Sequence, residues 1–511
     1  MSRHIMPTVL VILALSLITG CSSAETIVAL PNDPGLLPTD LPAEIIDTPW
    51  DDFSVFAAGL IAAEDKTLDS FSDSTIYHLD FTISTDLSTL TGAEQVRYTN
   101  REDTALDEVY FRLFPNITGG STVISNLRVN DNAVAPIYEY SDSSLRVPIN
   151  PALQPGESVV IEMDFAVTLA QEMAGNYGLF GYFNDVLVLD TFYPTIPVYD
   201  QKGWYAGEPA PNGDISYYDA SFYIVKVTLP KKYVVVASGS EVSRLEAGVS
   251  QTLTFVAGPA RDFYLAASEH FSVTSAVVGE TTVNSYAFKD QMDGAQHALT
   301  IAVNAMESFN NRLGIYPYTE FDIISSPMQA LGIEYPGIVG IVIDIYDLGG
   351  VSWGIPNEIM MEGTVAHEVG HQWFYNVVGN DQSNHPWLDE AIVQYITGLY
   401  YLDTYDQLAQ DGWQRSWNDR WDRVNRADIP IGMSAGSYSG QEYGAIIYGR
   451  GPLFITALEV EMGSEIFAVF LRDYYQDHKW GTSTASDFHA AAEEHCQCDL
   501  SPLFDAWVYD R

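Results

Sequence analysis

Basic residues, cysteines and long apolar runs are all scarce in this chain of 511 residues. It has 23 Lys and Arg residues against 68 Asp and Glu residues, which gives a formal net charge of −45. Nucleic-acid binding normally needs a surplus of basic side chains, so the composition argues against a nucleic-acid partner. After the first twenty residues no run of 18 apolar residues occurs, and the sequence therefore predicts no membrane-spanning helix in the remainder.

The few cysteines do not form a thiolate metal site by their spacing. Cys496 and Cys498 stand near the C-terminus with only His495 beside them, whereas a zinc site needs further ligands in register. In an exported protein this pair either forms a short disulfide or stays free, and both alternatives remain open.

The start of the chain has the pattern of an export signal. Arg3 precedes an apolar stretch from about residue 6 to residue 18, and Gly20 and Cys21 follow. The pattern resembles a bacterial lipoprotein signal, which implies that residues 1–20 are removed and that Cys21 carries a lipid. The protein would then lie outside the cytoplasm, in the cell envelope, anchored to a membrane. An ordinary signal peptide that is cleaved without lipidation is the alternative.

The composition then changes twice along the chain. Residues 21–74 are rich in Pro, Asp, Ser and Thr with little periodicity, which predicts a flexible tether. From 75 to 278 apolar residues alternate with polar ones, as at Val159, Ile161 and Met163, and this alternation is typical of strands with one buried face. The sequence predicts an antiparallel, sandwich-like β domain over residues 75–278.

From residue 279 to residue 511 the apolar pattern becomes mostly helical. Apolar residues spaced by three and four lead from Leu299 to Leu313, just before Gly314, which predicts a helix with a glycine at its C-terminal end. Further helices are predicted at 357–378, 387–402 and about 452–463, with strands at 321–324 and 338–345. The predicted fold class is therefore multidomain, with a β domain followed by a mostly helical α/β domain.

Two histidines stand four residues apart inside the helix predicted at 357–378. Residues i and i+4 share one face of a helix, so His367 and His371 can both approach a single zinc ion. Glu368 can reach a water molecule at the metal and take up its proton during attack on a carbonyl group. The pattern predicts a metal-dependent hydrolase.

A catalytic zinc site needs a third protein ligand. Metzincins continue with a glycine and a further histidine, but Phe374 and Val377 occupy those positions here, which excludes that class. Glu390 lies on the next predicted helix, where it could complete a site of two histidines and one glutamate. We therefore expect one Zn²⁺ per chain.

Three motifs together resemble the aminopeptidase N family of zinc metallopeptidases, which are gluzincins with an HExxH-x18-E pattern. The first is the run from His367 to Phe374 followed by Trp387-Leu-Asp-Glu390-Ala. The second is Gly332-Ile-Glu-Tyr-Pro-Gly337, at the place of the family's Gly-Ala-Met-Glu-Asn signature, and the third is Tyr448-Gly-Arg-Gly451, which matches Tyr-x-Lys-Gly. Thermolysin-type gluzincins space the glutamate differently. The resemblance covers about residues 75–511.

The resemblance implies a role for each residue that matches a family motif. The zinc ligands would be His367, His371 and Glu390, the general base Glu368, the oxyanion-stabilising residue Tyr448, and the substrate-binding residues Glu334, for the free α-amine, and Tyr443. It also implies a thermolysin-like catalytic domain over 279–511 and, since the chain stops near the end of that domain, no C-terminal helical domain. Ile333 and Tyr335 depart from the family's Met and Asn, so a preference for the first substrate residue does not transfer. Arg450 replaces the family's Lys.

The expected function is a zinc aminopeptidase that removes N-terminal residues from peptides with a free N-terminus. A zinc endopeptidase using the same site is the first alternative, and Glu334 argues against it. A non-catalytic peptide-binding lipoprotein is the second, and the complete set of candidate catalytic residues argues against that.

Overall fold

The computed structural model describes residues 45–173, 177–215 and 217–509. The predicted signal peptide, Cys21 and the tether as far as residue 44 lie outside the described residues. Within those ranges, no helix combines the length and the apolar character that crossing a bilayer requires.

The N-terminal part of the described chain is built of strands. They are β1 (Ile76–Ile83), β2 (Thr89–Thr99), β3 (Leu106–Arg112), β4 (Ser121–Val129), β5 (Asn132–Ala133), β6 (Ile137–Glu139), β7 (Ser144–Leu153), β8 (Ser158–Thr168), β9 (Phe180–Phe183), β10 (Val186–Leu189), β11 (Tyr199–Asp200), β12 (Gly203–Trp204), β13 (Ser221–Pro230), β14 (Val234–Ala237), β15 (Ser240–Ala247), β16 (Ser250–Ala260) and β17 (Leu265–Ser268). The largest sheet has the order β15-β16-β13-β1-β2-β8-β4-β5, and smaller sheets have the orders β14-β17-β10-β9 and β3-β7-β6.

The alternation that predicted these strands also decides which side chains form the core. On β8 every second residue, including Val159 and Ile161, is buried, while the residues between them are more exposed. Most neighbouring strands pair antiparallel, as expected, but β1 pairs with β13 in parallel, with Tyr77 opposite Tyr223. Alternation does not distinguish the two pairings, because it reports which face is buried and not the direction of the neighbouring strand.

Residues 45–74 are packed, which differs from the tether predicted there. They form 3₁₀ segments at Ile45–Asp47, Ser54–Gly59 and Ala62–Ser70. Phe56 is buried against Phe222 of β13, and Glu64 forms an ion pair with Lys479. Val55, Phe56 and Leu60 of this stretch are buried in one core with side chains that lie far away in the sequence, and this burial fixes the stretch.

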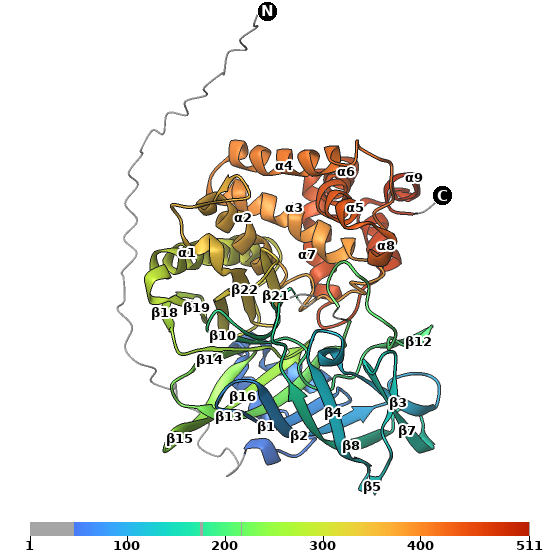
Figure 1. Ribbon diagram of the computed structural model, residues 1–511. Coiled ribbons are helices and arrows are strands. Elements are labelled where there is room, and N and C mark those ends of the chain that lie inside the picture. The colour runs from blue at the N-terminus through green and yellow to red at the C-terminus, as the bar shows by residue number, and fades with distance from the viewer. Residues whose placement is uncertain (1–44, 174–176, 216, 510–511) are drawn as a thin grey trace, which may run out of the picture. The chain divides into compact units, whose positions relative to one another are not determined.

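The C-terminal part combines a sheet with helices, as expected. Its strands are β18 (Phe271–Val278), β19 (Thr281–Phe288), β20 (Glu320–Ser326), β21 (Gly332–Tyr335), β22 (Ile338–Val342), β23 (Val351–Ser352) and β24 (Ile355–Pro356). Its helices are α1 (Met292–Arg312), α2 (Asn357–Gly370), α3 (Trp387–Thr404), α4 (Gln407–Asp422), α5 (Gly440–Ala445), α6 (Gly451–Met462), α7 (Ser464–Asp477), α8 (Ala485–Cys496) and α9 (Ser501–Trp507). The sheet order is β18-β19-β20-β22-β21, and α1 and α2 lie beside it (Figure 1). β18 belongs to this sheet and begins at Phe271, so the C-terminal part begins before the domain boundary predicted between residues 278 and 279.

Helix α2 is shorter than the helix predicted at 357–378. It ends at Gly370, and the following loop is held by the dipeptide Arg261-Asp262 from the β-rich part. The buried Arg261 guanidinium donates hydrogen bonds to the carbonyl oxygens of Asn376, at 3.0 Å, and Val377, at 3.3 Å. Asp262 accepts a hydrogen bond from the hydroxyl of Tyr375, whose φ is 128°. These distant partners satisfy the loop's polar groups, so its backbone need not continue as a helix.

Of the two alternatives for the C-terminal cysteine pair, a disulfide or free thiols, the structure has the disulfide. Cys496, the last residue of α8, is bonded to Cys498 across Gln497. The disulfide form excludes thiolate metal binding by these two residues.

Glu94 is a buried acidic residue in the core of the β-rich part, and its burial predicts a pH-dependent effect on stability. It is 1% exposed on β2, and neither carboxylate oxygen has a hydrogen-bond partner among the described residues. Burial raises its pKa. A carboxyl group whose pKa is higher in the folded state destabilises that state increasingly as the pH rises above the pKa of the unfolded chain. We therefore expect Glu94→Met to stabilise the protein, by about 1–3 kcal/mol near pH 8 and by less near pH 5.

Thermal unfolding at both pH values measures this effect. The exposed Asp107 on β3 offers a control, and Asp107→Asn should change neither midpoint appreciably. An equal gain for Glu94→Met at both pH values, or a loss of stability, would contradict the assignment of Glu94 as an uncompensated buried acid.

Candidate functional site

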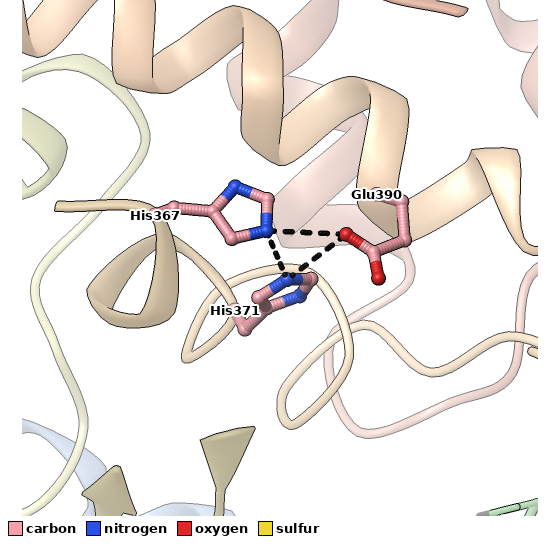
Figure 2. A group of neighbouring side chains, drawn as sticks. All are labelled: His367, His371 and Glu390. Atoms are coloured by element: carbon pink, nitrogen blue, oxygen red, sulfur yellow. Dashed lines mark hydrogen bonds and ion pairs between the residues drawn. The ribbon is translucent and has the colours of Figure 1, made fainter. Parts of the chain in front are cut away.

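Three side chains that the sequence predicted as metal ligands converge in the structure (Figure 2). His367 lies in the last turn of α2, His371 is the first residue after it, and Glu390 lies in the first turn of α3. His367 Nε2 is 3.1 Å from His371 Nε2 and 3.1 Å from Glu390 Oε2, and His371 Nε2 is 3.5 Å from the same oxygen. Although α2 ends at Gly370, His371 keeps helical backbone angles, so the i, i+4 relationship is preserved.

These separations fit a metal ion. Ligand atoms placed tetrahedrally at about 2.0–2.1 Å from zinc stand about 3.3 Å from one another, and the observed values lie on both sides of this. Two imidazoles and a carboxylate are also donors that zinc accepts. A second group, formed by Glu334, His371 and Asp389, has ligand atoms within 4.8 Å of one another. It fits less well, because the His371 Nδ1 atom on that side is occupied by a hydrogen bond to the carbonyl oxygen of Phe374, at 3.1 Å.

The electrostatics of the three residues also favour a cation. Burial lowers the pKa of His367 to about 4, so its imidazole is neutral and keeps a lone pair for a metal. Burial alone would raise the pKa of Glu390, but hydrogen bonds with His367 and His371 outweigh it and hold that pKa well below its usual range. For His371, burial lowers the pKa, and Glu334 and Glu390 together raise it by more. The carboxylate charge concentrated here is what a bound cation would offset.

Glu368 lies next to the first histidine and against the bare backbone of Gly332. A Cβ atom added at Gly332 would lie 2.4 Å from Glu368 Oε1, so a side chain at this position would displace the carboxylate. Gly332 begins β21, which is an edge strand of its sheet. Burial raises the pKa of Glu368 to about 8, and a cation held nearby would favour its charged form.

Two tyrosines lie on the other side of Glu390. Tyr448, in the π-helical segment Ile446–Arg450, donates a hydrogen bond from its hydroxyl to Glu390 Oε1. Tyr443 on α5 packs against it, with ring centroids 6.0 Å apart. Burial raises the pKa of both phenols, so both hydroxyls keep their protons and can donate hydrogen bonds.

Glu334 on β21 is buried beside the same cluster. Its Oε1 atom is 3.9 Å from His371 Nδ1 and accepts a hydrogen bond from Gln382 Nε2 at 3.3 Å. The same Gln382 nitrogen donates to Asp389 Oδ2 at 2.8 Å. Burial raises the pKa of Glu334, and the nearby Asp214 raises it further. A positively charged ligand group would relieve this repulsion between carboxylates.

Sequence reasoning missed Asp214, Gln382 and Gln394 as neighbours of the site. Asp214 belongs to a loop of the β-rich part, and the preceding Asn212 fixes that loop by donating a hydrogen bond to the carbonyl oxygen of Tyr438 at 2.8 Å. Burial and the charge of Glu390 raise the pKa of Asp214 to about 6. No local pattern identifies Asp214 or Gln382, because they come near the site only through tertiary contacts. The four-residue spacing from Glu390 on the same helix was a signal for Gln394.

The remaining predicted site residue, Cys21, lies outside the described residues. All the others, from Glu334 to Tyr448, come together around α2 and α3 in a single cluster, in which Tyr448 is half-buried and the rest are buried.

Comparisons with known proteins indicate the family and the fold. Residues 297–507 match the model of the peptidase family M1 domain. Aminopeptidase M1-B of Oryza sativa subsp. japonica is 22% identical over 401 residues, which cover 75% of this chain and 44% of that protein. Aminopeptidase N of Lactococcus lactis subsp. lactis is 23% identical over 254 residues, which cover 46% of this chain and 29% of that protein. The chain thus spans less than half the length of these curated relatives.

A solved structure is similar along nearly its whole length. The crystal structure of an M1 zinc metallopeptidase from Deinococcus radiodurans superposes with a TM-score of 0.60 at 19% identity, covering 86% of this chain and 94% of that chain. At this identity the likeness establishes the fold, with a β-rich part followed by a helical part. The matched domain and the curated relatives, taken with this fold, support the M1 aminopeptidase family of zinc metallopeptidases for this chain.

Proposed function

We propose that this protein is a zinc-dependent aminopeptidase that releases N-terminal residues from peptides. The observation that carries the proposal is the convergence of His367, His371 and Glu390, with Glu368 and Glu334 buried beside them. Two curated relatives are named aminopeptidases, which supports the same activity here. A similar structure, that of a mutant of the Deinococcus radiodurans metallopeptidase, contains a bound Tyr-Ser-Ala substrate, which supports peptides as the substrate class here.

In this proposal His367, His371 and Glu390 hold one zinc ion per chain. A bound zinc ion would polarise the scissile carbonyl group and lower the pKa of a water molecule towards neutrality. The Nδ1–H group of His371 donates to the carbonyl oxygen of Phe374, which directs its Nε2 lone pair to the metal position. Because Arg261 holds the loop that follows Phe374, the β-rich part also helps to orient this histidine.

The chain's own side chains would carry the proton and stabilise the developing charge. Glu368 accepts the proton of the attacking water and passes it to the leaving amine, as a general base and then a general acid. Tyr448 turns its hydroxyl from Glu390 to the developing oxyanion and donates a hydrogen bond to it. Tyr443, packed against Tyr448, contributes to the substrate-binding wall.

Glu334 would bind the α-ammonium group of the substrate. An α-amine has an unperturbed pKa near 8, so it is largely charged at neutral pH, and burying the charge is costly unless a carboxylate meets it. Glu334 is buried at 6% exposure and is held in place by Gln382. An endopeptidase would have no use for a buried carboxylate at this position, which is why we favour an exopeptidase.

A panel of chromogenic aminoacyl amides and their N-acetyl analogues, assayed with and without a chelator, tests the function. The parent should cleave free-amine substrates and lose this activity on chelation. Glu334→Ala should cut kcat/KM for free-amine substrates by roughly 30-fold or more, because the ammonium loses a buried partner worth about 2 kcal/mol or more. Acetylated analogues should be poor substrates for both proteins. If the parent cleaves both classes equally well, the site belongs to an endopeptidase.

If neither class is cleaved and zinc is nevertheless bound, the alternative of a non-catalytic peptide-binding protein takes its place. Isothermal titration with a free-amine peptide then distinguishes a binder from an inactive preparation.

We also propose the finer architecture that the family resemblance implies. The strands before β18 would form a sandwich-like domain, and α1 to α9 with their sheet a thermolysin-like catalytic domain. The packing of α2 against β21, β22 and α3 supports the second assignment.

The envelope location is a separate proposal. The Ile18-Thr-Gly-Cys21 sequence supports cleavage before Cys21 and attachment of a lipid to it. Intact-mass measurement of the mature protein tests this, since a first residue other than a diacylated Cys21 would contradict lipid anchoring.

A further inference from the structure

One buried polar side chain touches the metal cluster without belonging to it. Gln394 on α3 is 3% exposed, and its amide nitrogen Nε2 lies 3.3 Å from Nδ1 of His367. Gln394 follows Glu390 by four residues, so the two side chains leave the same face of the helix. Its amide oxygen Oε1 has no hydrogen-bond partner among the described residues.

The imidazole of His367 has two neutral tautomers, and each needs a different partner at Nδ1. With the proton on Nε2, that nitrogen donates to Glu390 Oε2, 3.1 Å away, and Nδ1 must accept a hydrogen bond. With the proton on Nδ1, the Nε2 lone pair is free for a metal, and Nδ1 must donate. Binding of a metal by His367 therefore requires a hydrogen-bond acceptor beside Nδ1.

A primary amide can meet both requirements, because it carries a donor and an acceptor at similar positions. When Nδ1 of His367 must accept a hydrogen bond, the Nε2 group of Gln394 can donate it. When Nδ1 must donate, rotation of the amide by half a turn brings Oε1 into position to accept. A carboxylate could only accept, and an aliphatic side chain could do neither. The backbone of Gln394 is held as well, since its carbonyl oxygen accepts a hydrogen bond from Trp413 Nε1 at 3.0 Å.

We propose that Gln394 is a positioning residue of the metal site, whose amide oxygen accepts the Nδ1 proton of His367 when the histidine binds the metal. The inference rests on the proposed function only in taking zinc as the metal. In this proposal Gln394 accepts from Nδ1 of His367, just as the carbonyl oxygen of Phe374 accepts from Nδ1 of His371.

The test compares two substitutions at this position by zinc binding. Gln394→Met keeps the length and removes the acceptor, and it should raise the Kd for zinc about 10- to 100-fold in competition with a chelator. Gln394→Glu keeps an acceptor, and its Kd should be no higher than that of the parent. At saturating zinc the Met variant should recover most of its kcat, which a general disruption of the site would not allow.

Thr397→Val provides the matched control on the same helix. Thr397 is fully buried, its hydroxyl donates to the carbonyl oxygen of Val393, and it is not among the converging ligand residues. This variant should bind zinc as the parent does.

The outcomes separate this inference from the proposed function. A Kd for Gln394→Met within about threefold of the parent would overturn the role of Gln394 and leave the function standing. A parent protein that binds no zinc would refute the function itself. If the Met variant does not fold, the Glu variant decides, since a Kd raised about tenfold or more would contradict the acceptor role.

Discussion

Glu368→Gln should abolish most of the hydrolytic rate while the protein keeps its zinc. The amide has nearly the same shape as the carboxylate, so it can occupy the space against Gly332, but it cannot take a proton from water. Loss of a general base typically costs about 10²- to 10⁴-fold, and we expect kcat to fall by at least the lower of these values. Because Glu368 is not among the converging ligand atoms, the zinc content should stay near one per chain.

Steady-state kinetics on a free-amine chromogenic amide, together with elemental analysis, measures both effects. Glu358→Gln is the matched control, since it makes the same substitution at an exposed position of α2 and should leave the rate unchanged. If Glu368→Gln retains activity within about threefold of the parent, another group acts as the base.

Replacing a ligand should give the opposite pattern, with the loss of metal coming first. In His371→Ala or Glu390→Ala only two of the three converging donors remain, and two donors do not hold zinc firmly in a site that also needs an open position. The zinc content should fall well below one per chain after dialysis, and hydrolysis should drop to background. Glu390→Ala also removes the hydrogen-bond acceptor of Tyr448, so excess zinc should restore little of the hydrolytic activity of this variant.

Elemental analysis after dialysis provides the measurement, and His270→Ala provides the control. His270 is exposed and lies in the turn between β17 and β18, outside the metal cluster, so its removal should change neither zinc nor rate. Full zinc occupancy in both ligand variants would refute the assignment of His371 and Glu390.

The local part of the site follows from the sequence alone. The four-residue spacing of His367 and His371 fixes their common helix face, because a helix repeats every 3.6 residues. Glu390 could be placed on the next helix because its apolar pattern is also local. The alternation in β8 likewise predicted which residues are buried. Each of these features depends on residues within about two turns or one strand of each other, so short-range periodicity is sufficient to predict them.

Other features depend on contacts between distant residues, and only the tertiary structure decided them. The end of α2 at Gly370 depends on Arg261, more than a hundred residues earlier in the chain. The packing of residues 45–74 and the parallel pairing of β1 with β13 depend in the same way on partners that local periodicity does not identify.

The residues that surround the metal cluster also depend on contacts that only the tertiary structure decides. Asp214 reaches it from the β-rich part, Gln382 connects Glu334 with Asp389, and Gln394 meets His367 across two helices. In the sequence these are ordinary polar residues. The sequence thus determined the residues that we propose to bind a metal and activate water. The folded chain decided which buried groups orient them, because hydrogen-bond partners for buried polar atoms are found only when distant segments pack together.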